Sequence, residues 1–327
     1  MGQPAERILS RWVELATAGL VCVAIGFGLI NPWPDRNGLV PDYAWSSVEA
    51  GALFRGEQPV LVVPDAVKLA ALFAAGSWMA GLETRGETAV KPIFVAAIPK
   101  DLKDLPSVTQ RKQLFLGALL PLVLEVNDSI LEDREYLQGL ARRMGDGEDI
   151  GDEDRAWLAA LFGAYQVEPG DVGALLERID VVPSSLALAQ AALESGWGTS
   201  RFALEGRALF GQRTYGGESG LRPSSAGEGD EFLVRSFPHL RDAVRAYMHN
   251  LNTNQAYREF RARRAESRRQ GNGPRGEALV AHLARYSERG HDYVKALGRI
   301  IRENNLEPLD AARLLRDDPL HVIVPGA

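Results

Sequence analysis

The sequence has few of the residues that cross-link a chain or bind a metal ion. Cys22 is the only cysteine among 327 residues, so an intrachain disulfide is impossible. The five histidines are scattered, and no Cys–His group has the spacing of a zinc site. We therefore expect no zinc site, and we expect stability to come from packing alone.

The sequence also has no excess of basic charge. It holds 37 lysines and arginines against 43 aspartates and glutamates, a formal net charge of -6, and this gives no reason to expect a nucleic acid as partner. The composition, 46% hydrophobic and 24% charged, is that of an ordinary globular protein. The length allows one domain of ordinary size and a substantial extra segment.

One long apolar run lies near the N-terminus. Residues Trp12–Ile30 are apolar except for Glu14 and Thr17. A helix over Trp12–Trp33 would be about 31 Å long, close to the thickness of a bilayer core, with a tryptophan at each interface. We expect residues 1–34 to form an uncleaved signal anchor. A cleaved signal peptide and a buried helix are the alternatives, although no small-x-small cleavage pattern follows the run.

Composition and breaks divide the rest of the chain. A stretch rich in proline, glycine and aspartate predicts a linker, and an acidic, glycine-containing break at Asp146–Asp154 separates two helical regions. The expected segments are a linker at 35–63, a helical region of unknown role at 64–150, a main domain at 151–310 and a C-terminal tail at 311–327.

Several helices are expected on either side of the acidic break. The pattern from Pro64 predicts a helix with Asp65 as its N-cap. Residues from Ser107 predict one or two helices, with Pro121 either as a kink or as the first turn of a second helix. Amphipathic helices are expected at about 152–165 and 170–179. The apolar run at 91–102 lies between prolines and is compatible with an extended segment.

The most informative stretch, 183–215, reads PSSLALAQAALESGWGTSRFALEGRALFGQRTY. Ser184 or Ser185 can cap a helix here, and Gln190 and Glu194 lie one turn apart on the same face. Glu194 ends the helix where Ser-Gly-Trp-Gly breaks it.

The position of Glu194 suits a general acid. Trp197 and Phe202 are apolar neighbours in sequence, and desolvation of a carboxylate raises its pKa toward neutrality. A helix C-terminus also disfavours negative charge. A lone glutamate at such a place is more commonly a solvated surface carboxylate, so the case depends on the residues around it.

Those residues resemble the Bax-type branch of the bacterial endo-β-N-acetylglucosaminidases, glycoside hydrolase family seventy-three. The resemblance rests on AQAALESGWGTSRFALEG and LFGQ, continues through AVRAYMHNLNTNQAYREFR and YSERGHDYVKALGRII, and covers about 180–303. A fainter likeness reaches back through IPKDL and RKQLFLGALLPLVLEVNDSIL. The resemblance implies an α+β, mainly α, fold: a lysozyme-like domain with a small β-hairpin lobe. The helical region and the membrane helix precede this domain.

The resemblance also assigns roles to individual residues. Glu194 matches the family's catalytic acid, Tyr286 matches a tyrosine of the substrate cleft, and Phe210 matches the aromatic lining of the groove. Ala208 departs from the commoner Asn-Leu-Phe-Gly pattern, which puts any polar contact from that position in doubt.

A second carboxylate usually acts opposite the acid in glycoside hydrolysis. The family supplies it from a β-hairpin after the Leu-Phe-Gly turn, which here corresponds to 216–237. Glu228, before the return strand, is the first choice, with Glu231 second and Glu218 third. The alternative is that all three are solvated loop charges.

Three further residues are candidates for substrate binding. Gln190 shares the face of Glu194, while Trp197 and Tyr215 either stack on sugar faces or pack in the core. The arginine-rich run at 257–269 predicts a solvated helix face with ion pairs to Glu259 and Glu266. Its alternative role is attraction of wall carboxylates.

The resemblance implies hydrolysis of the β-1,4 bond after N-acetylglucosamine in peptidoglycan glycan strands, a reaction that requires no metal ion and no organic cofactor. The expected location is the inner membrane, single-pass, with the catalytic domain on the cell-wall (periplasmic) side. The expected partners are therefore glycan strands and the membrane. Two other functions remain open, a lytic transglycosylase and an inactive wall-binding or scaffold protein.

Overall fold

A computed structural model describes residues 60–76, 88–215, 219–223 and 232–326. The expected membrane helix at 1–34 and most of the expected linker lie outside these residues. The described chain is mainly helical with short strands, an α+β architecture as predicted.

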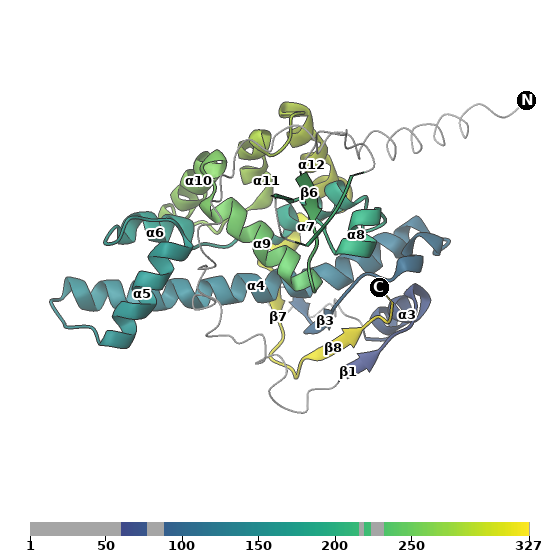
Figure 1. The fold of residues 1–327 in the computed structure, drawn as a ribbon, viewed down its shortest axis with the longest axis horizontal. Coiled ribbons are helices and arrows are strands. Elements are labelled where there is room, and N and C mark those ends of the chain that lie inside the picture. The colour runs from purple at the N-terminus through teal and green to yellow at the C-terminus, as the bar shows by residue number, and fades with distance from the viewer. Residues whose placement is uncertain (1–59, 77–87, 216–218, 224–231, 327) are drawn as a thin grey trace, which may run out of the picture.

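The longest helix, α4 (Val108–Gly145), runs horizontally across the molecule in Figure 1. Ser107 caps it, because its hydroxyl accepts a hydrogen bond from the Gln110 N–H at 3.3 Å. Pro121 is buried inside the helix and does not divide it, so the alternative of a single helix is the correct one. Among the described residues, α4 alone is long and apolar enough to span a membrane, yet most of its apolar stretch is buried inside the protein, as in a core helix.

The helices expected from Pro64 and at about 152–165 and 170–179 are confirmed as α3, α5 and α6. Asp65 caps the helix predicted from Pro64, accepting a hydrogen bond from the Lys68 N–H at 2.8 Å. The α-helices are α3 (Ala66–Gly76), α5 (Asp152–Ala164), α6 (Val172–Arg178), α7 (Ser184–Ser195), α8 (Arg201–Gly206), α9 (Leu240–Thr253), α10 (Arg258–Arg269), α11 (Gly276–Leu279) and α12 (His291–Glu303). The 3-10 helices are η2 (Lys100–Asp104), η3 (Gln255–Tyr257), η4 (Val280–Tyr286) and η5 (Glu307–Ala311).

The strands form three small sheets. A parallel sheet has the order β1 (Val60–Val62), β8 (Leu320–Ile323), β3 (Ile93–Val95), and β2 (Ala89–Val90) pairs in parallel with β7 (Arg313–Leu314). The residues expected as a C-terminal tail thus supply the central strand of a sheet. An antiparallel sheet has the order β4 (Arg213–Tyr215), β6 (Phe232–Arg235), β5 (Gly220–Leu221), in the region where a hairpin was expected.

A single hydrophobic core joins the expected helical region 64–150 to the expected main domain. The helix α4 packs against both α7 and α9, and these helices lie above it in Figure 1. Fully buried side chains of α4, such as Phe115 and Leu119, belong to the same core as Leu186 of α7 and Val244 of α9. The position of α7 therefore depends on residues far outside its own segment.

The arginine-rich helix α10 differs from its prediction as a solvated face. Arg261 and Arg264 are 2% and 0% exposed. Arg264 donates hydrogen bonds to the carbonyl oxygens of Asp180 and Val181, each at 2.9 Å, and forms an ion pair with the Asp180 carboxylate. The prediction was wrong for these two arginines because the buried loop before α7 has carbonyl groups that need donors. Only the outer part of the helix, with the Glu266–Arg269 pair, is exposed.

Candidate active site

The helix α7 is held at its N-terminus by a distant carboxylate. Asp310 accepts hydrogen bonds from the backbone N–H of Ser185 and from that of Gly276, both at 2.8 Å. Ser184 and Ser185 lie in the first turn and neither caps the helix, since Pro183 is the N-cap residue and makes no side-chain cap. The predicted serine cap was therefore wrong, and Asp310 fixes the start of α7 and of α11 together.

The C-terminus of α7 ends as the Ser-Gly-Trp-Gly sequence predicts. Gly196 is the left-handed C-cap with φ 59°, and Gly198 follows with φ 79°. A Cβ atom on Gly198 would lie 2.7 Å from Ile98 and 2.8 Å from Phe115, so only glycine fits. The turn thereby packs against the start of α4 and fixes where Glu194, in the last turn of α7, is presented.

The Glu194 carboxyl has the pKa expected of a general acid. Its side chain is only partly exposed, and burial raises its pKa to about 7, which confirms the predicted role of desolvation. A hydrogen bond from the Tyr293 hydroxyl and the positive charge of Arg289 act in the opposite direction. At neutral pH the carboxyl is thus divided between its protonated and ionised forms.

Five aromatic rings surround the carboxyl and form what we call the aromatic cluster. Phe210 stacks on Tyr247 with ring centroids 3.9 Å apart, and Tyr286 stacks on Tyr293 at 5.6 Å. Tyr257 lies 5.9 Å from Tyr286. Burial raises the pKa of all four tyrosines and the charge of Glu194 adds to the rise, so all four hydroxyls remain protonated. Of the four tyrosine hydroxyls, that of Tyr293 is the one whose hydrogen bond affects the pKa of Glu194.

Buried hydrogen bonds link the cluster to the acid in a chain. The Tyr247 hydroxyl donates to Gln190 Oε1 at 2.6 Å, and Gln190 Nε2 donates to the Tyr293 oxygen at 2.9 Å. A side-chain hydrogen bond from Tyr293 also lowers the pKa of Glu194. Gln190 and Glu194 share one face of α7, as predicted from their spacing.

Comparison with known proteins identifies the family. A family model described as mannosyl-glycoprotein endo-beta-N-acetylglucosaminidase (Glucosaminidase) matches residues 172–306. Protein bax of Escherichia coli (strain K12) is 32% identical over 210 residues, which cover 62% of this chain and 73% of that protein. The chain belongs to the Bax-type glucosaminidase family. No solved structure matches it. In this glucosaminidase-family chain the matched segment holds Glu194, Gln190 and the whole aromatic cluster.

Two residues predicted to contact substrate are buried. Gln190 is 0% exposed and both ends of its amide bond to tyrosines, while Phe210 is 3% exposed beneath Tyr247. In this structure neither presents a surface to a ligand, which corrects their predicted place on the groove. Their residue types suggested sugar contact, whereas both side chains contact buried tyrosines of the aromatic cluster.

The other predicted site residues lie in varied settings. Tyr286 is partly exposed beside the acid, and its hydroxyl donates to the Phe210 carbonyl oxygen at 3.1 Å. Trp197 packs edge-on against Phe115 at 5.7 Å, with Lys112 Nζ 4.5 Å above its ring, so most of its contacts are with the core. The backbone of Tyr215 belongs to β4 and pairs with that of Phe232.

The three candidate second carboxylates, Glu228, Glu231 and Glu218, lie outside the described residues. The choice among them stays a prediction. Within the described ranges, no group of three or more His, Cys, Asp or Glu side chains could hold a metal ion.

Sequence reasoning missed Tyr247, Tyr257, Tyr293 and Arg289. Tyr286 and Tyr293 flank the turn between η4 and α12, and Arg289 is an exposed residue of that turn. The spacing of seven residues between the two tyrosines was visible in the sequence, but nothing local indicated that both would face Glu194.

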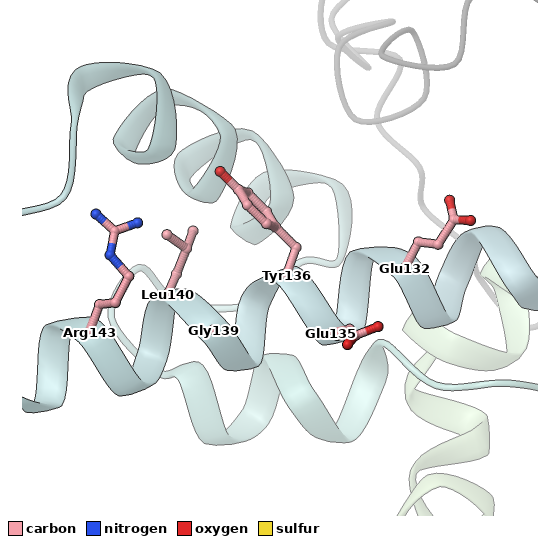
Figure 2. Close-up of a pocket in the computed structure, with 6 residues that line it drawn as sticks. All are labelled: Glu132, Glu135, Tyr136, Gly139, Leu140 and Arg143. Atoms are coloured by element: carbon pink, nitrogen blue, oxygen red, sulfur yellow. The ribbon is translucent and has the colours of Figure 1, made fainter.

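A separate open groove lies along the far part of α4. Figure 2 shows Tyr136, Leu140 and Arg143 on one side of this helix, with Gly139 between them. Tyr136 packs edge-on against Trp157 at 4.9 Å. No residue that lines the groove belongs to the aromatic cluster or bonds to Glu194, so the groove is not part of the site described here.

Proposed function

We propose that this protein hydrolyses the β-1,4 bond after N-acetylglucosamine in peptidoglycan glycan strands, with Glu194 as the general acid. The observation that carries the proposal is a partly exposed carboxyl with a pKa of about 7 at the end of α7, beside four tyrosines. A general acid works best when its pKa lies near the working pH. The same proposal includes a lysozyme-like fold for the catalytic domain.

The site supports a division of roles. Glu194 in its protonated form gives its proton to the leaving glycosidic oxygen. The hydrogen bond from Tyr293 and the charge of Arg289 then stabilise the carboxylate that remains. Tyr286, the partly exposed tyrosine of the cluster, orients the sugar. Water attacks the anomeric carbon with help from a second carboxylate, Glu228 first, or from the acetamido group of the substrate.

The proposed location follows from the apolar N-terminus. Residues 1–34 anchor the protein in the inner membrane, and the catalytic domain faces the cell wall. If so, the full chain sediments with membranes and is released by detergent but not by salt, while a chain without residues 1–34 is soluble. Solubility of the full chain in low salt would contradict the anchor without affecting the proposed chemistry.

The decisive experiment digests purified peptidoglycan with the full chain, beside the isosteric variant Glu194→Gln, and identifies the new chain ends by mass spectrometry. We expect N-acetylglucosamine reducing ends from the wild type and a loss of at least about 100-fold in the variant, because general-acid transfer contributes on that order. Glu205→Gln, on an exposed residue of α8, is the matched control and should keep full activity.

The other outcomes are equally definite. Anhydro-muramic ends would assign the protein to the lytic transglycosylases, which need no second carboxylate. Wall binding that survives Glu194→Gln, with no products from either protein, would assign a binding or scaffold role. Equal activity of wild type and Glu194→Gln would show that another group is the acid.

A further inference from the structure

The hydrogen-bond chain beside Glu194 has a fixed direction. An O–H···O bond is typically shorter than an N–H···O bond. The contact from Tyr247 to Gln190 is 2.6 Å and that from Gln190 to Tyr293 is 2.9 Å, so the amide oxygen faces Tyr247 and the amide nitrogen faces Tyr293. The amide nitrogen has no free lone pair, and Tyr293 therefore receives a hydrogen bond from Gln190 and keeps its own proton for another acceptor.

The acceptor available is the carboxyl of Glu194, which lies one turn from Gln190 on the same face of α7. A hydrogen bond from the Tyr293 hydroxyl is among the causes that lower the pKa of Glu194. Tyr247 and Gln190 are 0% exposed and Tyr293 is 2% exposed, so water does not compete for these groups. Stacking of Tyr247 on Phe210 and of Tyr293 on Tyr286, with interplanar angles of 6° and 5°, holds the two rings in place. In a buried chain of this kind each bond orients the next.

We propose that Tyr247 is a positioning residue for the acid: through Gln190, it directs the Tyr293 hydroxyl toward the Glu194 carboxylate. This inference rests on the proposed role of Glu194. Tyr247 does not contact the carboxyl itself, because Gln190 and Tyr293 lie between them. Tyr247 controls the orientation of the Gln190 amide group.

The proposal explains why the amide does not take its other orientation. With the amide turned over, Gln190 Nε2 would donate to Tyr247, and Tyr293 would donate to Gln190 Oε1. Glu194 would then lose its donor, and the Tyr247 proton would lose its acceptor within the chain. The Tyr247 hydroxyl selects between the two arrangements because its proton needs the amide oxygen.

The proposal predicts an effect of Tyr247→Phe on the titration of Glu194. Without the Tyr247 hydroxyl the amide is free to turn, Tyr293 donates to Gln190, and the pKa of Glu194 rises by about one unit, because a hydrogen bond to the charged form lowers a pKa. Tyr293→Phe removes the same donor directly and should raise the pKa in the same direction. The double variant should match Tyr293→Phe alone, since both changes remove one hydrogen bond.

Two further variants make the test specific. Tyr257→Phe is the matched control, because the Tyr257 hydroxyl bonds to Asn250 and is no part of the chain; its loss should leave the pKa of Glu194 unchanged. Gln190→Met removes the acceptor to which Tyr293 would turn. In the Gln190→Met background, Tyr247→Phe should therefore cause no upward shift.

The measurement is a carboxyl ¹³C NMR titration of the full chain in detergent, with the Glu194 signal assigned by its absence from Glu194→Gln. An unchanged pKa in Tyr247→Phe, or an equal rise in Tyr257→Phe, would overturn the proposal. If Tyr247→Phe fails to fold, the Tyr247→Phe/Gln190→Met pair and Tyr293→Phe still decide it, because a shift that persists without Gln190 excludes the chain as its cause.

The activity of the same variants is then measured as a function of pH. The alkaline limb of kcat/KM should move up in pH with the pKa of Glu194 in both Tyr247→Phe and Tyr293→Phe, which a merely structural role would not cause. If the protein cleaves no glycan, the proposed function fails while the NMR titration still tests the chain. The two failures are therefore distinguishable.

Discussion

At the scale of single residues, the acid makes the folded protein less stable than it would be without a buried carboxylate. The pKa of Glu194 is about 7 in the folded protein against 4.5 for an ordinary glutamate. Between these values the unfolded chain releases its proton while the folded chain keeps it, so stability falls as pH rises from about 4.5 to about 7 and is level beyond. In the proposed mechanism, this loss of stability is the consequence of keeping a proton available at neutral pH.

Glu194→Gln should therefore stabilise the protein in a pH-dependent way. The expected gain in the free energy of unfolding is up to about 3 kcal/mol at pH 8, from a shift of some 2.5 pKa units, and close to zero at pH 4. Urea unfolding at pH 4, 6 and 8 measures it, with Glu205→Gln as a control that shows no such trend. A gain of the same size at all three pH values would contradict the assigned pKa.

At the scale of secondary-structure elements, sequence reasoning succeeded where the signal was local. The end of α7 at Glu194 follows from the Ser-Gly-Trp-Gly sequence beside it, and the predicted Asp65 cap bonds to an N–H only three residues away. It failed where the partner was distant. The cap of α7 is Asp310, 125 residues away, and Tyr293 and Tyr247 meet Gln190 across 103 and 57 residues.

The turn that ends α7 offers a test of this local determination. Gly198→Ala places a Cβ against Ile98 and Phe115 at a positive φ, and we expect it to lower the free energy of unfolding by about 1–3 kcal/mol. Gly163→Ala, in the helix α5 with nothing within 4 Å, should raise it by up to about 1 kcal/mol. Urea midpoints of both variants measure the contrast, and equal midpoints would show that the turn can move freely.

At the scale of the whole molecule, the matched family segment lacks elements on which its own core packs. It covers 172–306, while α4, which packs on α7, and Asp310, which caps α7, lie outside it. The fragment 151–327, which keeps the matched segment and Asp310, still lacks α4 and its fifteen buried residues. Truncating one large buried side chain already costs about 2–5 kcal/mol, against a net stability of about 5–15 kcal/mol for a domain.

We therefore expect 151–327 to lack a cooperative unfolding transition and to lose its near-ultraviolet circular dichroism, while 60–327 keeps both. The physical reason is that α4 packs against both α7 and α9. Its removal therefore exposes the hydrophobic core next to Glu194 and not a peripheral surface. A cooperative transition of 151–327 with the urea midpoint of 60–327 would show instead that α4 is dispensable. Glu194 should titrate near pH 4.5 in the fragment if α4 is required, because the burial that raises its pKa would be lost with the packing.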